Sequence, residues 1–196
     1  MSSSSLGRRL PFAVTAATCV AVLAVAAPAP AQSDKFRFFE ETAEAFWGVP
    51  HECPDGETVT ATLLVRTTRD FEYPDRDDVD PTARVQYQAV CPDGSSFTWG
   101  GIVPATIASE PNLKRVVASG AGSVRDIFGT THSVSFDVEW TAVGPLESTV
   151  NGPGSARKER AATASGTVTF DGDVLVDGPA LHPTRPEPFI RTDIEK

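Results

Sequence analysis

Histidine is the residue type best suited to acid-base chemistry near neutral pH, and the chain has three histidines. His51 precedes a turn, His132 begins an alternating apolar segment, and His182 lies in a proline-rich stretch. No G-x-S-x-G motif supplies an activated serine, since residues 164–167 lack its first glycine. Because the three sequence contexts share nothing, we expect surface histidines and assign no catalytic residue.

Aspartates are the residues that could bind a hard cation. Four of them occupy one polar segment: Asp75, Asp77, Asp78 and Asp80. Their oxygens suit Ca²⁺, but the spacing is not that of an EF-hand loop, because Asp80 stands where glycine is required and Gln86 where the final glutamate is required. A copper site of the type found in secreted sandwich proteins is excluded, because the only methionine is Met1 and both Cys53 and Cys91 are expected to be paired. A solvated acidic loop is therefore favoured over a weak calcium site, and we expect no cofactor.

The side chains of glycoside chemistry are present but poorly placed for it. Asp137 and Glu139 would lie about 7 Å apart on one face of a strand. That face is polar, and charges on such a face commonly serve solubility. Trp99 and Trp140 fall on the inward faces of their segments, so they indicate a core rather than a sugar-stacking surface.

Cys53 and Cys91 each begin the same four-residue sequence, Cys-Pro-Asp-Gly. Proline, aspartate and glycine suit the second, third and fourth positions of a tight turn, so each cysteine ends a strand. Two like turns at neighbouring strand ends would place the sulfurs at similar heights on a sheet. We therefore predict a disulfide that closes a loop of about 39 residues and contributes about 4 kcal/mol of stability. The lack of a CxxC spacing and of a nearby histidine or cysteine cluster argues against a redox or metal role.

The N-terminal segment predicts export. Arg8 and Arg9 precede an apolar run over residues 12–27 and a small-residue pattern at residues 29–31. This is the layout of a secretory signal peptide cleaved after Ala31, and the run is shorter than the roughly 20 residues of a spanning helix. We expect a secreted, extracellular protein with no membrane contact beyond the signal peptide; Sec and twin-arginine export both stay open.

The net charge excludes some partners. Residues 1–31 carry Arg8 and Arg9 and no acid, so their removal changes the formal charge from −9 to −11. A chain this acidic repels nucleic-acid phosphates and anionic membrane surfaces. The partner is therefore expected to be an extracellular ligand or protein. We also expect the chain to be a monomer.

Alternating apolar and polar residues predict an all-β fold. The clearest segment covers residues 132–142, where one face is apolar: Val134, Phe136, Val138, Trp140 and Ala142. Residues 58–65 and 84–91 follow the same period, and Gly, Pro and Asp cluster between such segments. We predict a single-domain antiparallel β-sandwich or partly closed β-barrel of about seven to nine strands with one disulfide.

The chain divides into three parts: residues 1–31 (signal peptide), 32–177 (all-β domain) and 178–196 (Pro-rich C-terminal tail). Residues 36–47 are ambiguous between strand and helix; we assign a strand because it would deliver Cys53 to an end of the sheet. Residues 73–81 and 151–159 are expected to form long polar loops. Prolines in the tail argue against regular strand pairing, so we expect it to be irregular.

One strand pairing follows from side-chain size. If residues 134–143 pair with residues 162–170, the small residues at 162, 164 and 166 would leave room for Trp140 or Phe136. This hypothesis assigns both aromatic side chains to packing rather than to a ligand.

Several segments occur together in a recognisable order. They are an aromatic segment at residues 36–47, Cys53 followed by a threonine-rich segment at 58–65, Cys91, VEWTAVGPL at 138–146 and RAATASGTV at 160–168. This layout resembles a group of secreted β-rich proteins of actinobacteria and some other bacteria. The resemblance covers most of the chain after the signal peptide and implies export and a β-rich fold. The group has no established activity, so the resemblance implies no mechanism.

Two classes of function are compatible with these features. The first is a non-enzymatic extracellular binding or structural protein that uses its loops or a barrel mouth. The second is a secreted hydrolase whose catalytic residues are dispersed along the chain. The lack of clustered histidines, metal ligands or a nucleophile motif favours the first.

Overall fold

Antiparallel β-strands dominate the structure, a computed structural model that describes residues 37–73, 80–152, 155–181 and 189–195. In chain order the elements are β1 (Arg37–Glu52), β2 (Thr58–Tyr73), β3 (Thr82–Val90), β4 (Ser96–Ser109), the 3-10 helix η1 (Pro111–Leu113), β5 (Arg115–Asp126), β6 (Thr131–Ala142), β7 (Glu147–Gly152), β8 (Ser155–Phe170), β9 (Asp173–Pro179) and β10 (Phe189–Glu195). Within these residues no helix is long and apolar enough to cross a membrane.

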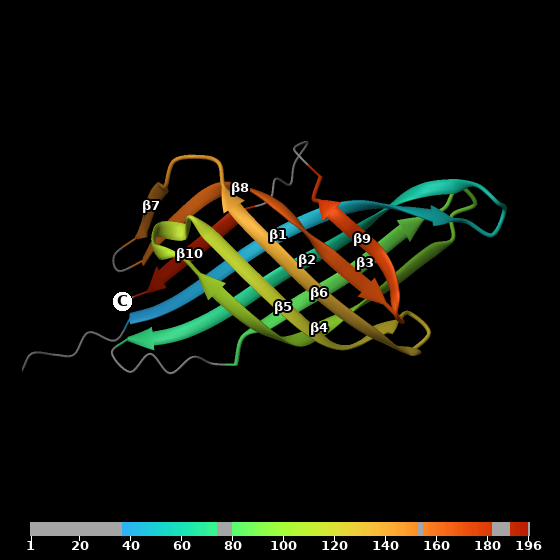
Figure 1. Cartoon of the computed structure of the whole chain (residues 1–196), viewed down its shortest axis with the longest axis horizontal. Coiled ribbons are helices and arrows are strands. Elements are labelled where there is room, and N and C mark those ends of the chain that lie inside the picture. Colours follow the sequence, from blue (N-terminus) through green and yellow to red (C-terminus); the bar gives the residue numbers. More distant parts are fainter. Residues whose placement is uncertain (1–36, 74–79, 153–154, 182–188, 196) are drawn as a thin grey trace, which may run out of the picture. The chain divides into compact units, whose positions relative to one another are not determined.

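The strands form one sheet that curls into a nearly closed barrel (Figure 1). Strands β1 to β6 pair in chain order, and β8 pairs with β6. The C-terminal strand β10 pairs with both β8 and β1 and so joins the two sides of the sheet. Farther along β8, β9 takes the place of β10, and the amide of Leu181 donates a hydrogen bond to the carbonyl of Phe46 in β1, at 2.8 Å. The all-β antiparallel prediction is confirmed, and of the two expected architectures the protein adopts the barrel.

Inward and outward side chains alternate along the strands as the sequence period requires. In β6 the predicted inward residues Val134, Phe136, Val138 and Trp140 are buried. The ambiguous first segment is a strand, and within it Ala43, Ala45, Trp47 and Val49 are buried. The tryptophans therefore belong to the core, as expected.

The predicted pairing of β6 with β8 is confirmed, with Trp140 opposite Ala164 and Phe136 opposite Val168. The indole N–H of Trp140 crosses the interior and donates to the carbonyl of Glu44 at 2.9 Å. Room for Phe136 comes from β5 instead of β8: a Cβ on Gly120 would lie 2.7 Å from Cε1 of Phe136. Small residues on both neighbouring strands therefore make space for the large aromatic side chains of β6.

Two segments differ from expectation. The stretch expected as a loop at residues 151–159 contains the end of β7 and the start of β8, which pair with each other. The tail expected to be irregular contains part of β9 and all of β10. The prolines do not prevent pairing because β10 begins directly after Pro188 and contains no proline itself. These two strands account for pairing that the sequence argument missed.

Some expectations fall outside the described residues. These are the signal peptide at residues 1–31, His182, and the aspartates Asp75, Asp77 and Asp78. Of the weak calcium candidate only Asp80 is described, and it is exposed.

We expect Trp140→Ala to lower the free energy of unfolding by about 3–5 kcal/mol, because a fully buried indole and its hydrogen bond are lost together. The melting temperature should fall by on the order of 10 °C in calorimetry. Val143→Ala, at a 58 % exposed position three residues farther along the chain, is the control and should change little. An unchanged melting temperature for Trp140→Ala would reject the packing role.

Candidate functional site

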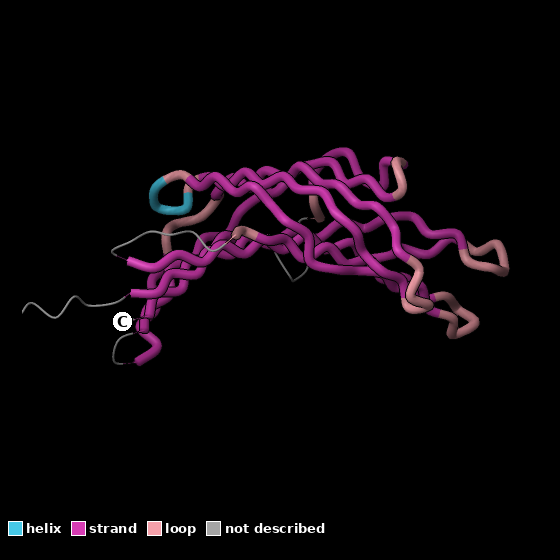
Figure 2. The backbone as a smooth tube through the Cα atoms, turned by 90° about the horizontal axis from the view of Figure 1, so that it is seen from below, coloured by secondary structure: helices cyan, strands magenta, loops and turns pink. Residues whose placement is uncertain are grey.

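Four turns gather at one end of the barrel, which we call the disulfide end: residues 53–57, 91–95, 127–130 and 171–172. They connect β1 to β2, β3 to β4, β5 to β6 and β8 to β9. Figure 2 shows these loops together at the right-hand end of the barrel. Because an antiparallel strand order returns every second connection to the same side, this end collects His51, His132 and both paired cysteines.

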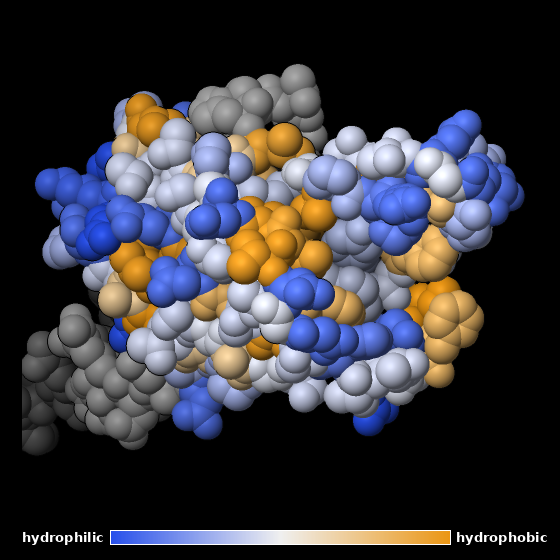
Figure 3. Space-filling model, turned by 45° about the vertical axis from the view of Figure 1, so that its right-hand side comes forward, coloured by the Kyte–Doolittle hydropathy of each residue, from blue (hydrophilic) through white to orange (hydrophobic). Residues whose placement is uncertain are grey.

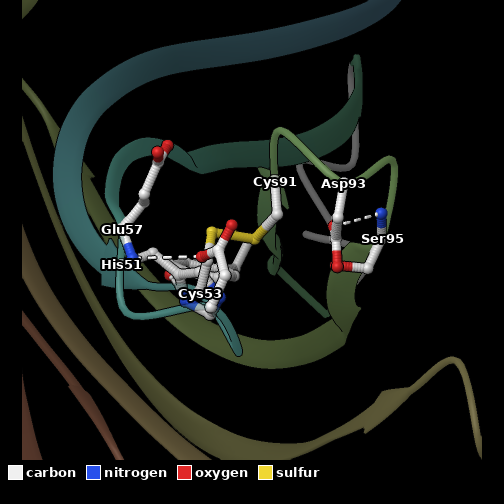
Figure 4. Close-up of a disulfide and its surroundings, with 8 residues drawn as sticks. His51, Cys53, Glu57, Cys91, Asp93 and Ser95 are labelled. Carbon is white, nitrogen blue, oxygen red and sulfur yellow. Dashed lines mark hydrogen bonds between the residues drawn. A yellow bond between two sulfur atoms is a disulfide. The ribbon is translucent and has the colours of Figure 1, made fainter.

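The repeated Cys-Pro-Asp-Gly sequences form two equivalent turns. In each, the glycine amide donates to the cysteine carbonyl, at 2.9 Å for Gly56 and 3.0 Å for Gly94. Both glycines have φ of 86°, a conformation that favours glycine. The predicted disulfide joins the turns, with the Cα atoms of Cys53 and Cys91 5.9 Å apart (Figure 4). The doubled motif therefore clamps the ends of β1 and β3, the two strands that flank β2 in the sheet.

His51 lies against this disulfide, which the sequence argument overlooked. One of its ring nitrogens and the sulfurs of Cys53 and Cys91 all lie within 4.8 Å of one another. Nδ1 is 2.9 Å from the hydroxyl of Tyr87, and the imidazole packs on Phe97 with ring centroids 4.7 Å apart. Nε2 is buried and has no hydrogen-bond partner among the described residues. His51 is therefore half-buried and less exposed than the expected surface histidine.

A row of aromatic rings runs from His51 to His132 across the inside of the barrel. We call it the aromatic row: His51, Tyr87, Trp99, Phe170 and His132. Tyr87 stacks on Trp99 with centroids 5.3 Å apart, and Trp99 stacks on Phe170 at 4.5 Å. The two histidines therefore stand at opposite ends of a packed row and do not form one acid-base pair.

His132 links three elements at the disulfide end. Its Nδ1 lies 2.7 Å from Oδ2 of Asp171, and its Nε2 lies 3.4 Å from Oδ2 of Asp126. The hydrogen bond with Asp171 raises the pKa of His132 above its usual value of 6.5; partial burial opposes this and Asp126 adds to it. Its partners respond in the opposite sense. Hydrogen bonds from His132 and the Ser133 amide lower the pKa of Asp171.

The pKa of Asp126 is also lowered. Partial burial opposes the shift, but the Thr130 amide and His132 outweigh that burial. Both ring nitrogens of His132 thus face carboxylates, and the nearby hydroxyl of Ser133 donates to Asp171 at 3.2 Å instead of contacting the imidazole. His132 and its two aspartates form an ionic clasp, and no serine nucleophile contacts that histidine in the described residues.

Asp137 and Glu139, the two carboxylates considered for glycoside chemistry, are not placed for that role. Arg115 binds Glu139 through two hydrogen bonds of 2.7 and 2.8 Å, which lower the pKa of that carboxyl. Asp137 is exposed. The pair therefore has no acid in an apolar pocket of the kind that glycoside hydrolysis needs.

The turn between β5 and β6 exposes two apolar side chains that the sequence argument did not single out. Phe128 is 82 % exposed and Ile127 is 56 % exposed. The turn is tightly held, because Oδ1 of Asp126 accepts the amides of Phe128 at 2.9 Å and Thr130 at 2.8 Å. The amide of Ile127 donates to the carbonyl of Thr98 in β4 at 3.2 Å. Two apolar side chains are thus presented to solvent by a well-bonded turn.

Carboxylates dominate the surface around these turns. The acids of the four turns and the adjoining strand ends are Glu52, Asp55, Glu57, Asp93, Asp126, Asp171 and Asp173. Arg125 is the only arginine or lysine in those segments. On the face drawn in Figure 3, apolar surface is broken up by hydrophilic surface. The disulfide end therefore combines exposed apolar groups with a strongly negative surround.

No protein family, curated protein or solved structure matches the chain.

We expect the ionic clasp to make stability depend on pH. Because the folded pKa of His132 lies above 6.5, its contribution is fully present below about pH 6.5 and is lost as pH rises through the folded value. The lowered pKa values of Asp126 and Asp171 mean that their contribution is present above about pH 3.8 and is lost as pH falls through the folded values.

The stability difference between the wild type and His132→Gln should therefore be largest between about pH 4 and 6.5 and smaller at pH 9. Denaturant unfolding across this range measures it. Asp173→Asn, at an exposed acid of the same turn region, is the control and should follow the wild-type pH profile. Parallel profiles for the wild type and His132→Gln would show that the clasp has no role in stability.

Replacing both Cys53 and Cys91 by Ser should lower the free energy of unfolding by about 4 kcal/mol, since the unfolded chain regains the freedom that the closed loop removes. Urea unfolding of the oxidised wild type and the double variant tests this. Equal midpoints would mean that the clamp contributes nothing to stability.

Proposed function

We propose that the chain is an exported, non-enzymatic binding domain whose disulfide end docks onto a protein with a basic surface and an apolar recess. The signal-peptide layout and the internal disulfide support export to an oxidising compartment. The observation that carries the binding role is Phe128, an aromatic side chain held 82 % exposed on a well-bonded turn.

An exposed aromatic side chain on a hydrogen-bonded turn is suited to anchoring a partner. Large aromatic groups that fill a partner's pocket supply a large share of binding energy at protein interfaces. Because the hydrogen bonds of Asp126 already order the turn, little conformational entropy would be lost on association. Ile127 extends the apolar contact on the same turn.

The surrounding charges favour one kind of partner. Seven carboxylates and one arginine occupy the turns of this end and the adjoining strand ends, so a basic protein surface is electrostatically complementary and an acidic one is repelled. Such complementarity raises association rates and makes binding depend on salt. An anionic membrane or a nucleic acid would meet the same repulsion.

The alternative, a hydrolase, has one observation in its favour: the 2.7 Å contact between His132 and Asp171 resembles the base and orienting acid of a catalytic triad. Against it, Nε2 of that histidine faces Asp126 instead of a nucleophile. The binding role uses the observed contacts without rearrangement, so we favour it.

The binding role predicts that Phe128→Ser weakens partner binding at least tenfold. Immobilised wild type and variant would be exposed to spent medium of the producing organism, and a retained protein would be purified and titrated against both. Val150→Ser is the matched control, because Val150 is 77 % exposed on β7, away from the disulfide end.

Three results together support the proposal: a basic partner, release by added salt, and loss of binding in Phe128→Ser but not in Val150→Ser. Retention that is equal for all three proteins, or that is insensitive to salt, contradicts it. A hydrolytic activity that disappears in His132→Gln would support the enzyme instead.

A further inference from the structure

Three potential metal donors meet at the disulfide end: the imidazole of His51 and the sulfurs of Cys53 and Cys91. These ligand atoms lie within 4.8 Å of one another. Ligand bonds of about 2.3 Å for zinc to sulfur and 2.0–2.1 Å for zinc to nitrogen place tetrahedral donors roughly 3.5–3.8 Å apart. Small side-chain movements would therefore bring the three donors to ligand spacing. Figure 4 shows the histidine beside the two sulfurs.

While the disulfide is intact, its two sulfurs are not strong metal ligands, because cysteine binds metals as the thiolate. We infer that reduction of Cys53–Cys91 opens a site for one soft or borderline d¹⁰ cation, Zn²⁺ or Cu⁺, bound by two thiolates and the imidazole of His51. This site is independent of the docking role of Phe128, and it would make the chain a redox-controlled metal binder.

The surroundings of His51 fit the role of a ligand. Its Nδ1 lies 2.9 Å from the hydroxyl of Tyr87, and if Nδ1 donates there, the lone pair of Nε2 is free. A metal-bound histidine usually donates its other ring N–H to such a partner, which fixes both tautomer and orientation. The Tyr87 hydroxyl has acceptor lone pairs and lies at hydrogen-bond distance, so it can accept that hydrogen bond.

Nε2 is the second indication of a ligand. It is buried and has no hydrogen-bond partner among the described residues, and a buried polar atom of this kind calls for an explanation. The imidazole also packs on Phe97, at a centroid distance of 4.7 Å. Tyr87 and Phe97 thus hold the ring beside the sulfurs before a cation arrives.

The donor types select the cation. Two thiolates and one imidazole are soft or borderline ligands, which suit Zn²⁺ and Cu⁺ and are poor for Ca²⁺ or Mg²⁺. Three protein ligands are enough for three-coordinate Cu⁺. Tetrahedral Zn²⁺ would need one further ligand, such as water.

A dithiol can act as the reductant of the Cys53–Cys91 disulfide by thiol–disulfide exchange. The dithiol loses two electrons and two protons and becomes a disulfide, while Cys53–Cys91 gains them and becomes two thiols. Binding of the cation then displaces both thiol protons to solvent. An external disulfide can reverse this step: it takes two electrons from the two thiolates and two protons from solvent to become a dithiol, while Cys53–Cys91 forms again and the cation is released.

The test uses the full chain carrying Cys19→Ser, so that Cys53 and Cys91 are its only cysteines. Oxidised protein and protein reduced with excess dithiothreitol, then freed of it without oxygen, are titrated with Zn²⁺ against a chromophoric chelator. Co²⁺ serves as a spectroscopic probe, since thiolate ligation gives a sulfur-to-metal charge-transfer band. We expect one Zn²⁺ per reduced chain and none on the oxidised chain.

His51→Gln separates a built site from a bare dithiol. It retains both cysteines and should weaken Zn²⁺ binding by the reduced protein at least tenfold, while His132→Gln should leave it unchanged. Circular dichroism of every reduced sample checks that the barrel persists, and Zn²⁺ should raise the melting temperature of the reduced wild type.

Three outcomes would overturn the inference. They are equal Zn²⁺ affinity in the reduced wild type and His51→Gln, binding that is equally strong in the oxidised protein, and no stoichiometric binding by reduced protein that retains its strands. None of these results bears on whether Phe128 docks a partner, so the two proposals fail separately.

Discussion

Closure of the sheet through β8 is the constraint on which the rest of the structure depends. An open sheet leaves unpaired backbone groups along its first and last strands, and pairing those edges with each other removes the problem. Strand β8 does this with its two halves: one half pairs with β6 and β9, and the other with β7 and β10. The C-terminal strand then returns to β1. Without β10, β1 would present a long free edge at that end.

Closure makes the interior of the barrel narrow, and large inward side chains face small residues on the neighbouring strands. Trp140 can lie across the barrel because Ala164 faces it, and its indole N–H reaches a backbone carbonyl of β1 on the far side. Gly120 leaves space for Phe136 in the same way. At the disulfide end the filling is aromatic, and stacked rings occupy the space between His51 and His132. Because side chains fill the interior, the turns at the disulfide end are the part of the barrel best placed to contact a partner.

The alternation of apolar and polar side chains made much of the fold predictable from sequence. Contacts between segments far apart in the chain were not predictable in this way. Alternation located β6, the repeated turns located the disulfide, and small residues in β8 located its pairing with β6, because each signal is local or pairwise. The strand β10 was missed because its pairing with β1 and β8 joins segments far apart in the chain. At the site, His51 and Cys53 are two residues apart at the end of β1, a spacing that places alternate side chains on one side of extended chain and that a CxxC pattern does not include. The contact between His132 and Asp171 joins two strands and had no local signal.

The disulfide end is held by two links of different chemistry that meet the exposed surface at one residue. The covalent link joins the β1–β2 and β3–β4 turns, and the ionic clasp joins the β5–β6 and β8–β9 turns. Asp126 belongs to the clasp through Oδ2, which faces His132, while its Oδ1 accepts the amide of Phe128. Because one carboxylate serves both contacts, its loss would loosen the clasp and the turn that presents the exposed ring together. The geometry that stabilises this end is thus also the geometry that positions its most exposed aromatic side chain.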